Sequence, residues 1–528
     1  MSRYEPLLVD GRWQASADAV GGFRAEDPAR GEPIGPVFPI SGSGDVEAVL
    51  RAATACAPSL AAVDAARIAE ALDACAVAIE ADADALIALA QAETGLPIQP
   101  RLREVELPRT CNQLRQAAEA ARSGSWRQPV IDTRQGLRAC FGALAKPVWV
   151  IGPNNFPFAF NAVAGSDFAS ALVAGNPVIA KAHPCHPATS QRLATCVHGA
   201  LVEAGLPPAS LQLLHHMEPS TGLRLAADPR LGAIGFTGSR RAGLALKSAA
   251  DAAGVLFHGE MSSLNPVFLL PGALHERSEA IADELFASCT LGSGQFCTRP
   301  GLCVVPRGAQ GDRFVEQAQT RFAAAPPALL LARSVLQQLE AGIVALRTAG
   351  ARLLCGGQRG SPGYRHAPSL LEVDAGTLAQ SRALQSEVFG PISLLVRCEL
   401  EQMPALAAQL EGQLCAAIYR ARDGADNALW PPLAAALRPR VGRLIDSRMP
   451  TGVTVSPAQQ HGGPFPSSSH AGFSAVGMPG AIRRFAAWQC FDHVADALLP
   501  PELRDRNRGG VPRLVDGVWT CADLEPQP

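Results

Sequence analysis

Two hydrophobic patterns divide the chain. Over residues 46–94 and 101–122 apolar side chains recur three and four positions apart, as Val46, Val49 and Leu50 show. That spacing places them on one face of a helix, so both stretches are predicted to be amphipathic helices. From about residue 147 onward, short apolar runs alternate with helical stretches instead. Such alternation predicts a parallel β-sheet with helices on both faces.

The apolar runs have the length of buried strands. The first region ends with the run 255–258, and a second alternating region extends from about 262 to 465. Between the early helices and the first region, two strand-like segments on either side of Gly136 predict a β-hairpin over residues 128–146. The other runs of the first region are 148–151, 177–180, 211–214 and 231–236.

These elements predict an α/β fold with two parallel-sheet domains and a β-hairpin that leaves the domain body. The tail after Leu498 is rich in Pro, Arg and Gly, which predicts a surface extension or an arm that reaches another subunit. The predicted boundaries are 1–127 with 147–260 for the first domain, 261–475 for the second, and 128–146 with 476–528 for the segments outside both.

Composition and charge exclude several classes of partner. Hydrophobic residues make up 48% of the 528 residues and charged residues 18%, which is ordinary for a globular protein. The formal net charge is -2 and Lys and Arg form no blocks, so no nucleic-acid partner is expected. No apolar run approaches the roughly 20 residues of a membrane span, and the N-terminus has no secretory pattern, so a cytoplasmic protein without a membrane partner is expected. The 14 cysteines show no disulfide framework and are expected to be reduced.

Cys297 and Glu260 are the candidate reactive groups. Cys297 follows the flexible run 292–295, which lets its sulfur meet a carbonyl carbon while its own N–H faces the developing oxyanion. A buried, inert cysteine is the ordinary alternative, and the small flanking residues favour the catalytic interpretation. Glu260 follows the run 255–258 and could activate water, although an isolated glutamate is usually a solvated surface charge.

A thiol that oxidises an aldehyde also needs an oxyanion donor and a hydride acceptor. Asn155 follows the run 148–151, so its amide can project from a strand end, or it can simply form a turn. Lys181 stands where a strand's carboxyl end meets the ligand crevice of an open α/β sheet. Beyond the run 231–236, a second turn opens a helix whose N-terminal amides can face a pyrophosphate, with Gly238, Ser239 and Gly243.

Clustered histidines raise the question of a metal site. His183, Cys185 and His186 lie together, as do His215 and His216. Prolines beside the first group prevent the helix that would align the ligands, and no second half of a site follows. No metal site is therefore expected.

Ordered motifs over nearly the full chain resemble the aldehyde dehydrogenase superfamily, and within it the α-ketoglutaric semialdehyde (2,5-dioxopentanoate) dehydrogenase group. The motifs that carry the resemblance are Asn155-Phe156-Pro157, Ala174-Gly175-Asn176-Pro177-Val178, Lys181-Ala182-His183-Pro184, Phe236-Thr237-Gly238-Ser239, Gly294-Gln295-Phe296-Cys297-Thr298, Glu387-Val388-Phe389-Gly390-Pro391, Pro450-Thr451-Gly452-Val453 and His461-Gly462-Gly463-Pro464.

The resemblance implies a role for each segment. Cys297 would be the nucleophile, Asn155 with the Cys297 amide the oxyanion hole, and Glu260 the base for thioester hydrolysis. The first domain would bind the cofactor and the second would carry the nucleophile, while the hairpin and a C-terminal strand would join subunits in a homodimer or homotetramer. The cofactor residues implied are Lys181, His183, Gly238, Ser239, Gly243, Glu387 and Phe389.

The cofactor is expected to be NADP or NAD. In NAD-preferring relatives an acidic residue three positions after the lysine grips the ribose hydroxyls, whereas this chain has Pro184 there. With no carboxylate to repel a 2′-phosphate, and with Lys181 and His183 nearby, NADP is allowed and favoured.

The expected reaction is NAD(P)-dependent oxidation of an aldehyde with a distal carboxylate, 2,5-dioxopentanoate, to 2-oxoglutarate. Such a substrate needs a cation, and the candidates are Arg109 with Gln113, or Arg299, with Phe156 as a further substrate-side residue. A medium- or long-chain fatty aldehyde dehydrogenase, a coenzyme-A-acylating enzyme and a catalytically silent protein of the same fold are the alternatives.

Some positions depart from the family pattern. Arg299 and Asp446 stand where asparagine is common, and the loop 467–473 lacks its usual arginine. These departures affect the expected substrate and subunit contacts.

Overall fold

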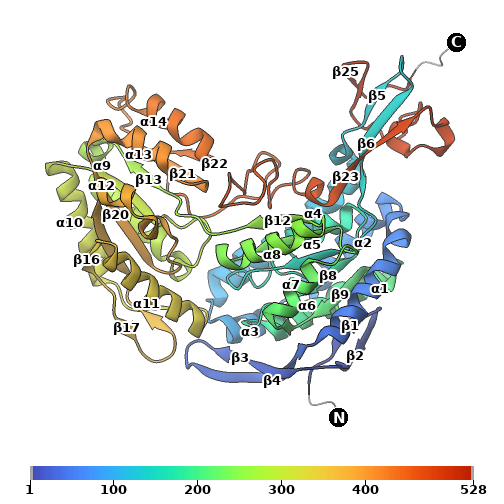
Figure 1. Ribbon diagram of the computed structural model, residues 1–528, viewed down its shortest axis with the longest axis horizontal. Coiled ribbons are helices and arrows are strands. Elements are labelled where there is room, and N and C mark those ends of the chain that lie inside the picture. The colour runs from blue at the N-terminus through green and yellow to red at the C-terminus, as the bar shows by residue number, and fades with distance from the viewer. Residues whose placement is uncertain (1–3, 525–528) are drawn as a thin grey trace.

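The computed structural model describes residues 4–524 and contains two seven-stranded sheets side by side (Figure 1). The first sheet has the order β12-β11-β7-β8-β9-β1-β2, in which five parallel strands are followed by two antiparallel edge strands. Its strands are β1 (Leu7–Val9), β2 (Arg12–Gln14), β7 (Val148–Ile151), β8 (Val178–Lys181), β9 (Leu211–Leu214), β11 (Ala233–Thr237) and β12 (Leu256–Glu260). The predicted parallel sheet is thereby confirmed.

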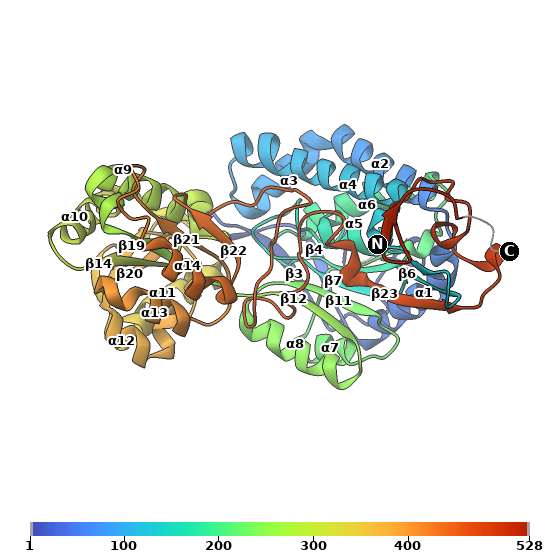
Figure 2. The ribbon, with the colours of Figure 1, turned by 90° about the horizontal axis from the view of Figure 1, so that it is seen from above.

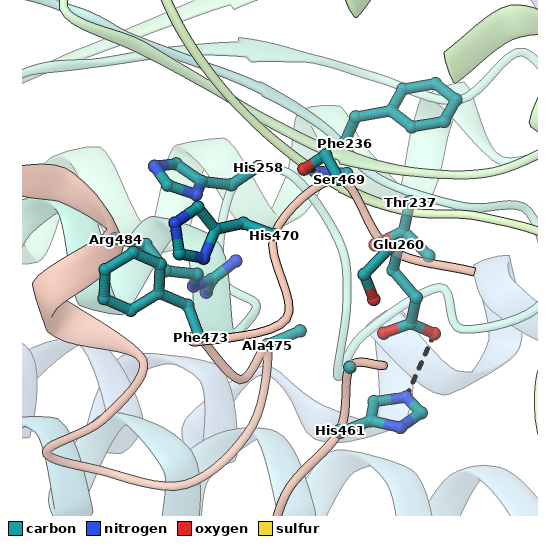
Figure 3. Close-up of a pocket in the computed structure, with 13 residues that line it drawn as sticks. Phe236, Thr237, His258, Glu260, His461, Ser469, His470, Phe473, Ala475 and Arg484 are labelled. Atoms are coloured by element: carbon teal, nitrogen blue, oxygen red, sulfur yellow. Dashed lines mark hydrogen bonds and ion pairs between the residues drawn. The ribbon is translucent and has the colours of Figure 1, made fainter. Parts of the chain in front are cut away.

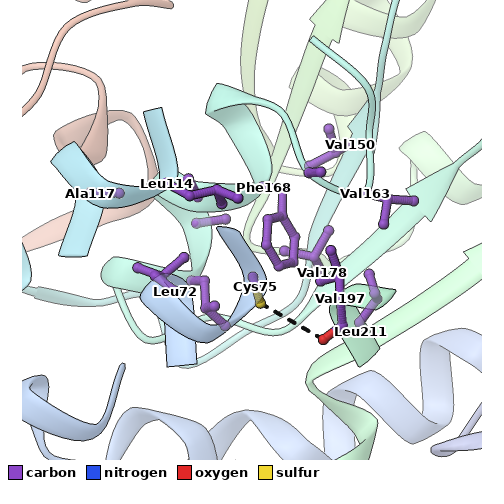
Figure 4. Packing of buried hydrophobic residues seen from close by; sticks show 14 of the residues in the cluster. Leu72, Cys75, Leu114, Ala117, Val150, Val163, Phe168, Val178, Val197 and Leu211 are labelled. Carbon is purple, nitrogen blue, oxygen red and sulfur yellow. Dashed lines mark hydrogen bonds between the residues drawn. The ribbon is translucent and has the colours of Figure 1, made fainter. Parts of the chain in front are cut away.

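Helices cover both faces of the first sheet (Figure 2). Because side chains alternate along a strand, Val148 and Val150 face one helix layer while Trp149 faces the other. The layer against Val148, seen in Figure 4, comprises α2 (Ala65–Ala81), α3 (Ala83–Thr94), α4 (Leu107–Ser123), α5 (Ser166–Val173) and α6 (Pro187–Glu203). The layer against Trp149 comprises α1 (Ser43–Ala61), α7 (Pro219–Ala226) and α8 (Arg240–Ala252).

The second sheet has the order β16-β19-β20-β14-β13-β21-β22 and is parallel except at β16. Its strands are β13 (Val267–Leu269), β14 (Leu302–Pro306), β16 (Arg352–Cys355), β19 (Ser369–Asp374), β20 (Ile392–Cys398), β21 (Gln413–Tyr419) and β22 (Val441–Asp446). Residues of α9 (Pro271–Thr290) and α10 (Ala309–Ala324) pack in one of its cores, and residues of α11 (Arg333–Thr348), α12 (Ala375–Gln380), α13 (Met403–Gln409) and α14 (Trp430–Leu437) in the other.

The predicted hairpin is confirmed as β5 (Val130–Asp132) and β6 (Leu137–Ala143), which project from the body in Figure 1. In a five-stranded sheet they pair with β23 (Ala486–Asp492) on one side and with β24 (Arg513–Val515) on the other, and β25 (Val518–Thr520) completes it. The tail after Leu498 thus folds back on the hairpin of its own chain.

Short strands and helices connect these layers. The residue ranges of the predicted domains stay a prediction. Within residues 4–524 no helix is long and apolar enough to cross a membrane. The connecting strands are β3 (Gly21–Asp27), β4 (Glu32–Ser41), β10 (His216–Met217), β15 (Ala328–Leu329), β17 (Arg359–Gly360) and β18 (Arg365–His366), and the short helices are η1 (Ile98–Glu106), η2 (Ser125–Arg127), η3 (Pro208–Ser210), η4 (Leu291–Gly294), η5 (Arg382–Gln385), η6 (Leu400–Gln402), η7 (Arg438–Arg440), η8 (Ile482–Phe485), η9 (Asp496–Leu498) and η10 (Pro501–Leu503).

Candidate active site

A cavity of about 460 Å³ lies at the carboxyl ends of the first sheet's strands, where that sheet meets the segments that follow η4 and η5. Parallel strands end at one edge of a sheet, so residues far apart in the chain converge there. Strand β7 brings the turn with Asn155, β8 brings Lys181, β12 brings Glu260, and the loop after η4 brings Cys297. The cavity therefore joins every predicted catalytic residue.

The turn before Cys297 is built from left-handed backbone. Gly292, Ser293 and Gly294 have φ of 56°, 59° and 70°. A Cβ on Gly294 would lie 2.2 Å from the carbonyl oxygen of Gly390, so only glycine fits there. After the turn, the Asn265 amide donates to the Cys297 carbonyl at 2.8 Å and holds the backbone at the sulfur in place. Sequence analysis gave no role to Asn265.

Asn155 reaches the Cys297 loop from the other domain. Its Nδ2 donates to the carbonyl oxygen of Gln295 at 2.8 Å, and the residue is 6% exposed. A side-chain amide has two N–H donors, so one remains for a substrate oxygen. The Asn155 carbonyl accepts a 2.7 Å hydrogen bond from Arg101 Nη2, and Arg101 forms a 3.0 Å ion pair with buried Glu106. Sequence analysis gave no role to this bracing pair.

Glu260 is the last residue of β12, which extends two residues beyond the predicted strand. The strand is longer than predicted because the distant 467–469 loop pairs with the edge of β12. Met261 N donates to Ser467 O at 2.7 Å, and Glu260 forms an antiparallel β-bridge with Ser468. Glu260 is 5% exposed, and its Oε1 lies 3.0 Å from His461 Nε2. A buried carboxylate beside an imidazole is suited to holding and activating a water molecule.

His461 stands between the two reactive groups. Its Nε2 lies 3.4 Å from Cys297 Sγ and 3.0 Å from Glu260 Oε1, and the residue is 3% exposed. Figure 3 shows the imidazole pointing at the Glu260 carboxylate, with His258, His470 and Arg484 grouped at the other side of the same pocket. Sequence reasoning placed His461 in a C-terminal motif without a role, because a histidine in an irregular loop carries no periodic signal.

The Cys297 thiol is neutral in this resting arrangement. Burial, and then the nearby Glu260 carboxylate, raise its pKa well above the usual value, since both disfavour a second negative charge. Proton removal must therefore accompany the approach of an electrophile. The groups within reach of the thiol proton are His461 and Glu260.

Arg109 on α4 lies near Cys297, although it does not line the 460 Å³ cavity. Its Nη1 donates to Val453 O at 3.0 Å and its Nε to Gln113 Oε1 at 3.4 Å, while buried Nη2 has no partner among residues 4–524. Burial lowers the pKa of Arg109. A Cys297 thiolate would raise that pKa more than any other nearby group, because the guanidinium lies close to the nucleophile. Gln113 also donates to Ala159 O at 2.9 Å and acts as a support for Arg109.

A cluster of aromatic rings lies next to the Cys297 loop, outside the lining of the cavity. Phe156 packs edge-on against Phe160 at 5.1 Å and against Phe296 at 5.4 Å. The Arg101 guanidinium lies 4.3 Å from the centre of the Phe156 ring, and that of Arg109 lies 5.2 Å from the centre of the Phe160 ring. The cluster is thus apolar, and two cations lie against its rings.

Arg299 does not face this space, which corrects the expectation that it could bind the substrate. The side chain is 2% exposed, and its guanidinium donates to the carbonyl oxygens of Ile392 and Val388. Those carbonyls belong to the second sheet and the segment before it, so the cation stabilises backbone there. The direction of the chain after Cys297 turns the side chain away from the cavity.

The other end of the cavity has polar groups suited to a dinucleotide. Lys181, His183, Gly238 and Ser239 line it, and Ser239 caps α8 by accepting from Ala242 N at 3.4 Å. Lys181 is half-buried and, among residues 4–524, donates to Ala182 O at 3.2 Å; loss of solvent lowers its pKa to about 8. An ammonium with one backbone acceptor, beside the first amides of α8, suits a phosphate or ribose oxygen.

Glu387 and Phe389 line the cavity from the segment after η5, and burial raises the pKa of Glu387 to about 7. Gly243 does not line the cavity. A Cβ there would lie 2.7 Å from Met261 Sδ, so this glycine permits α8 to pack closely against the segment after β12. The sequence could not separate these roles because both require a small residue.

Sequence comparisons add an independent finding. A model of the aldehyde dehydrogenase family matches residues 13–423. The alpha-ketoglutaric semialdehyde dehydrogenase 2 of Azospirillum brasilense is 39% identical over 517 residues, which cover 96% of this chain and 97% of that protein. The alpha-ketoglutaric semialdehyde dehydrogenase of Acinetobacter baylyi is 36% identical over 446 residues, which cover 82% of this chain and 83% of that protein.

Solved structures with the same fold are more distant in sequence. A mutant of aldehyde dehydrogenase C from Pseudomonas syringae, in complex with NAD+ and octanal, superposes with a TM-score of 0.80 at 21% identity, and the match covers 94% of this chain and 98% of that one. Lactaldehyde dehydrogenase from Escherichia coli superposes with a TM-score of 0.78 at 22% identity, covering 93% and 99%.

Proposed function

Because the chain belongs to the aldehyde dehydrogenase family, we propose that it oxidises 2,5-dioxopentanoate, an aldehyde with a distal carboxylate, to 2-oxoglutarate. The reaction class is that of the family, NAD(P)-dependent oxidation of an aldehyde to an acid. Two alpha-ketoglutaric semialdehyde dehydrogenases that match most of the chain support the substrate.

The observation that carries the substrate proposal is Arg109. A buried guanidinium whose Nη2 has no partner within the described chain is costly to maintain unless an anion binds it. Its position beside Cys297 suits a substrate whose carboxylate lies a few bonds from the reacting carbonyl. The apolar walls of Phe156 and Phe160 would contact the methylene groups between them.

The carbon–sulfur bond forms first. Cys297 Sγ attacks the aldehyde carbon while its proton passes to one of the two groups in reach, His461 or Glu260. The free N–H of Asn155 and the backbone N–H of Cys297 would donate to the developing oxyanion. The bond of Asn155 to Gln295 fixes that donor before the substrate arrives, so little reorganisation is needed.

The cavity fits NAD(P), which supplies the acceptor for the substrate's hydride when it is bound. Lys181 and the first amides of α8 would hold the phosphate and ribose groups, and Glu387 would hold the second ribose. His183 and Pro184 line the Lys181 side and leave it without a carboxylate, which supports binding of a 2′-phosphate.

Hydrolysis of the thioester completes the turnover. Glu260 is buried beside His461, and it would take a proton from a water molecule as that water attacks the acyl carbon. Cys297 then leaves as the sulfur of a free thiol, and the acid departs. A carboxylate in this position favours hydrolysis over transfer of the acyl group to another thiol.

A medium- or long-chain fatty aldehyde dehydrogenase is the second candidate. The observation in its favour is the apolar cluster of Phe156, Phe160, Phe296 and Val476, which could contact an alkyl chain. Steady-state rates on 2,5-dioxopentanoate, hexanal and octanal, each with NAD+ and NADP+, test the two candidates. The first proposal expects kcat/KM on the semialdehyde to exceed that on both alkanals; the reverse order supports the second.

A homo-oligomer is proposed as well. Strand β23 is an edge of the five-stranded sheet, and an edge strand offers unpaired backbone groups to another chain. Trp488 on that strand is 49% exposed, which is unusual for so large an apolar side chain. Light scattering coupled to size exclusion would give the mass of the assembly.

A further inference from the structure

Three side chains of different chemistry converge in the active site. Cys297 Sγ, His461 Nε2 and a carboxylate oxygen of Glu260 all lie within 4.8 Å of one another. Within that triangle Nε2 is 3.4 Å from the sulfur and 3.0 Å from Oε1. Glu260 and His461 are buried, so the triangle is shielded from bulk water.

These atoms match the ligand preferences of zinc. Sulfur, imidazole nitrogen and carboxylate oxygen are its common ligands, at about 2.3, 2.0 and 2.1 Å. A tetrahedral ion at those bond lengths would hold sulfur and nitrogen about 3.5 Å apart, and nitrogen and oxygen about 3.4 Å apart. The observed sulfur–nitrogen and nitrogen–oxygen distances of 3.4 and 3.0 Å lie within a few tenths of an ångström of those values, and the sulfur and the carboxylate oxygen lie within 4.8 Å of each other.

We propose that Cys297, His461 and Glu260 form a reversible inhibitory site for a zinc-class divalent cation. The thiol releases its proton, a metal–sulfur bond forms, and the imidazole and carboxylate supply the second and third ligands. No atom is oxidised or reduced, and the fourth position stays open to water. A chelator reverses the reaction, and the sulfur regains its proton.

Charge supports a divalent cation here. One thiolate and one carboxylate balance two positive charges, so the loaded site is neutral in a low-dielectric surrounding. Arg109 opposes the ion, because its guanidinium lies near both anionic ligands. Attraction by the two anionic ligands and repulsion by Arg109 together indicate an ion that binds but that a chelator can remove. While the sulfur binds the metal, it cannot attack an aldehyde.

The test begins with the full-length enzyme, freed of metal by a chelator that is then removed. Calorimetric titration with Zn²⁺ is expected to show one tight site per chain, and titration with Co²⁺ is expected to produce a thiolate charge-transfer band in the near ultraviolet. Cys490 and Cys521 are exposed and could bind metal adventitiously, so both are replaced by Ser in the parent protein.

His461→Asn removes one ligand and keeps the other two. It is expected to weaken Zn²⁺ at least about tenfold and to lose or shift the Co²⁺ band. The matched control is His470→Asn, an exposed histidine of a neighbouring loop, which is expected to bind Zn²⁺ like the parent. Equal Zn²⁺ affinity in His461→Asn and the parent, or no saturable site at all, overturns the proposal.

Kinetics provide an independent readout. In the parent enzyme Zn²⁺ is expected to inhibit competitively against aldehyde, and a chelator is expected to restore the full rate. Inhibition that does not depend on the aldehyde concentration also overturns the proposal. Metal binding is measured without substrate, so failure of the metal site and failure of the 2,5-dioxopentanoate assignment are separate results.

Discussion

Asn155 Nδ2 donates a 2.8 Å hydrogen bond to the carbonyl oxygen of Gln295, two residues before Cys297. This bond joins the turn after β7 to the loop that carries the sulfur, although 140 positions separate the two residues. One N–H of the amide thereby holds the Cys297 loop in place, and the other can donate to the oxygen of a substrate. The oxyanion site is consequently assembled by tertiary contact.

Removal of that donor should slow the chemical step. We expect Asn155→Ala to lower kcat by about 100-fold or more, the usual effect of losing one oxyanion donor. KM for the aldehyde should change little by comparison. Asn154→Ala, at the neighbouring position, is the control and should retain most of the rate; an equal loss in both variants would indicate a disrupted turn.

Replacement of the nucleophile should abolish oxidation without loss of the cofactor site. Cys297→Ala is expected to show no aldehyde-dependent NAD(P)H formation, because no other described thiol lines the cavity. Fluorescence titration with NADPH should still give saturable binding. Residual turnover above one per cent of the parent rate would mean that another nucleophile acts.

Loss of the base should separate the two half-reactions. Glu260→Gln keeps the shape of the side chain but cannot accept a proton from water, so hydrolysis is expected to fall about 100-fold. A stopped-flow burst of NAD(P)H should remain, followed by slow turnover. Full steady-state turnover in Glu260→Gln would rule out its assigned role.

The substrate cation is tested by Arg109→Met, which retains length and loses charge. We expect kcat/KM for 2,5-dioxopentanoate to fall about 30-fold or more, since an ionic hydrogen bond to a carboxylate is lost. The rate on pentanal, which has no carboxylate, should be unchanged or higher. Arg115→Met is the control, because that exposed residue on the same helix pairs with Glu80.

The cofactor preference should depend on pH through Lys181. Its pKa is lowered to about 8 by burial, so the ammonium is charged below that pH and loses its charge above it. Because a 2′-phosphate needs the charge more than a ribose hydroxyl does, the KM ratio of NADP+ to NAD+ should rise between pH 7 and 9. Lys181→Met should give a ratio that is nearly flat over the same range; a slope equal to that of the parent would exclude Lys181 as its source.

Much of the architecture was readable from local pattern. Short apolar runs that alternate with helical stretches predicted the parallel sheet, and the strand-like segments around Gly136 predicted the hairpin of β5 and β6. The rule that ligands bind at the carboxyl ends of parallel strands then placed Lys181 at a ligand crevice. These inferences succeeded because hydrogen bonding and side-chain alternation act between near neighbours in sequence.

Contacts between distant segments were not readable in this way. His461 lies 164 positions after Cys297, in a loop without regular structure, and only the fold brings its ring to the sulfur. Arg109 and Arg299 were equal candidates in the sequence. Tertiary packing leaves Nη2 of Arg109 free beside Cys297 and commits Arg299 to backbone carbonyls of the second sheet.

The sequence by itself determined the fold class, the family and the identity of the candidate nucleophile, base and oxyanion donor. Only the tertiary structure decided which cation faces the reacting centre, what extends β12 to Glu260, and which third side chain meets Cys297. The physical reason is that a side chain's direction and neighbours depend on contacts across hundreds of residues. Local preferences set the elements, and packing between elements sets the site.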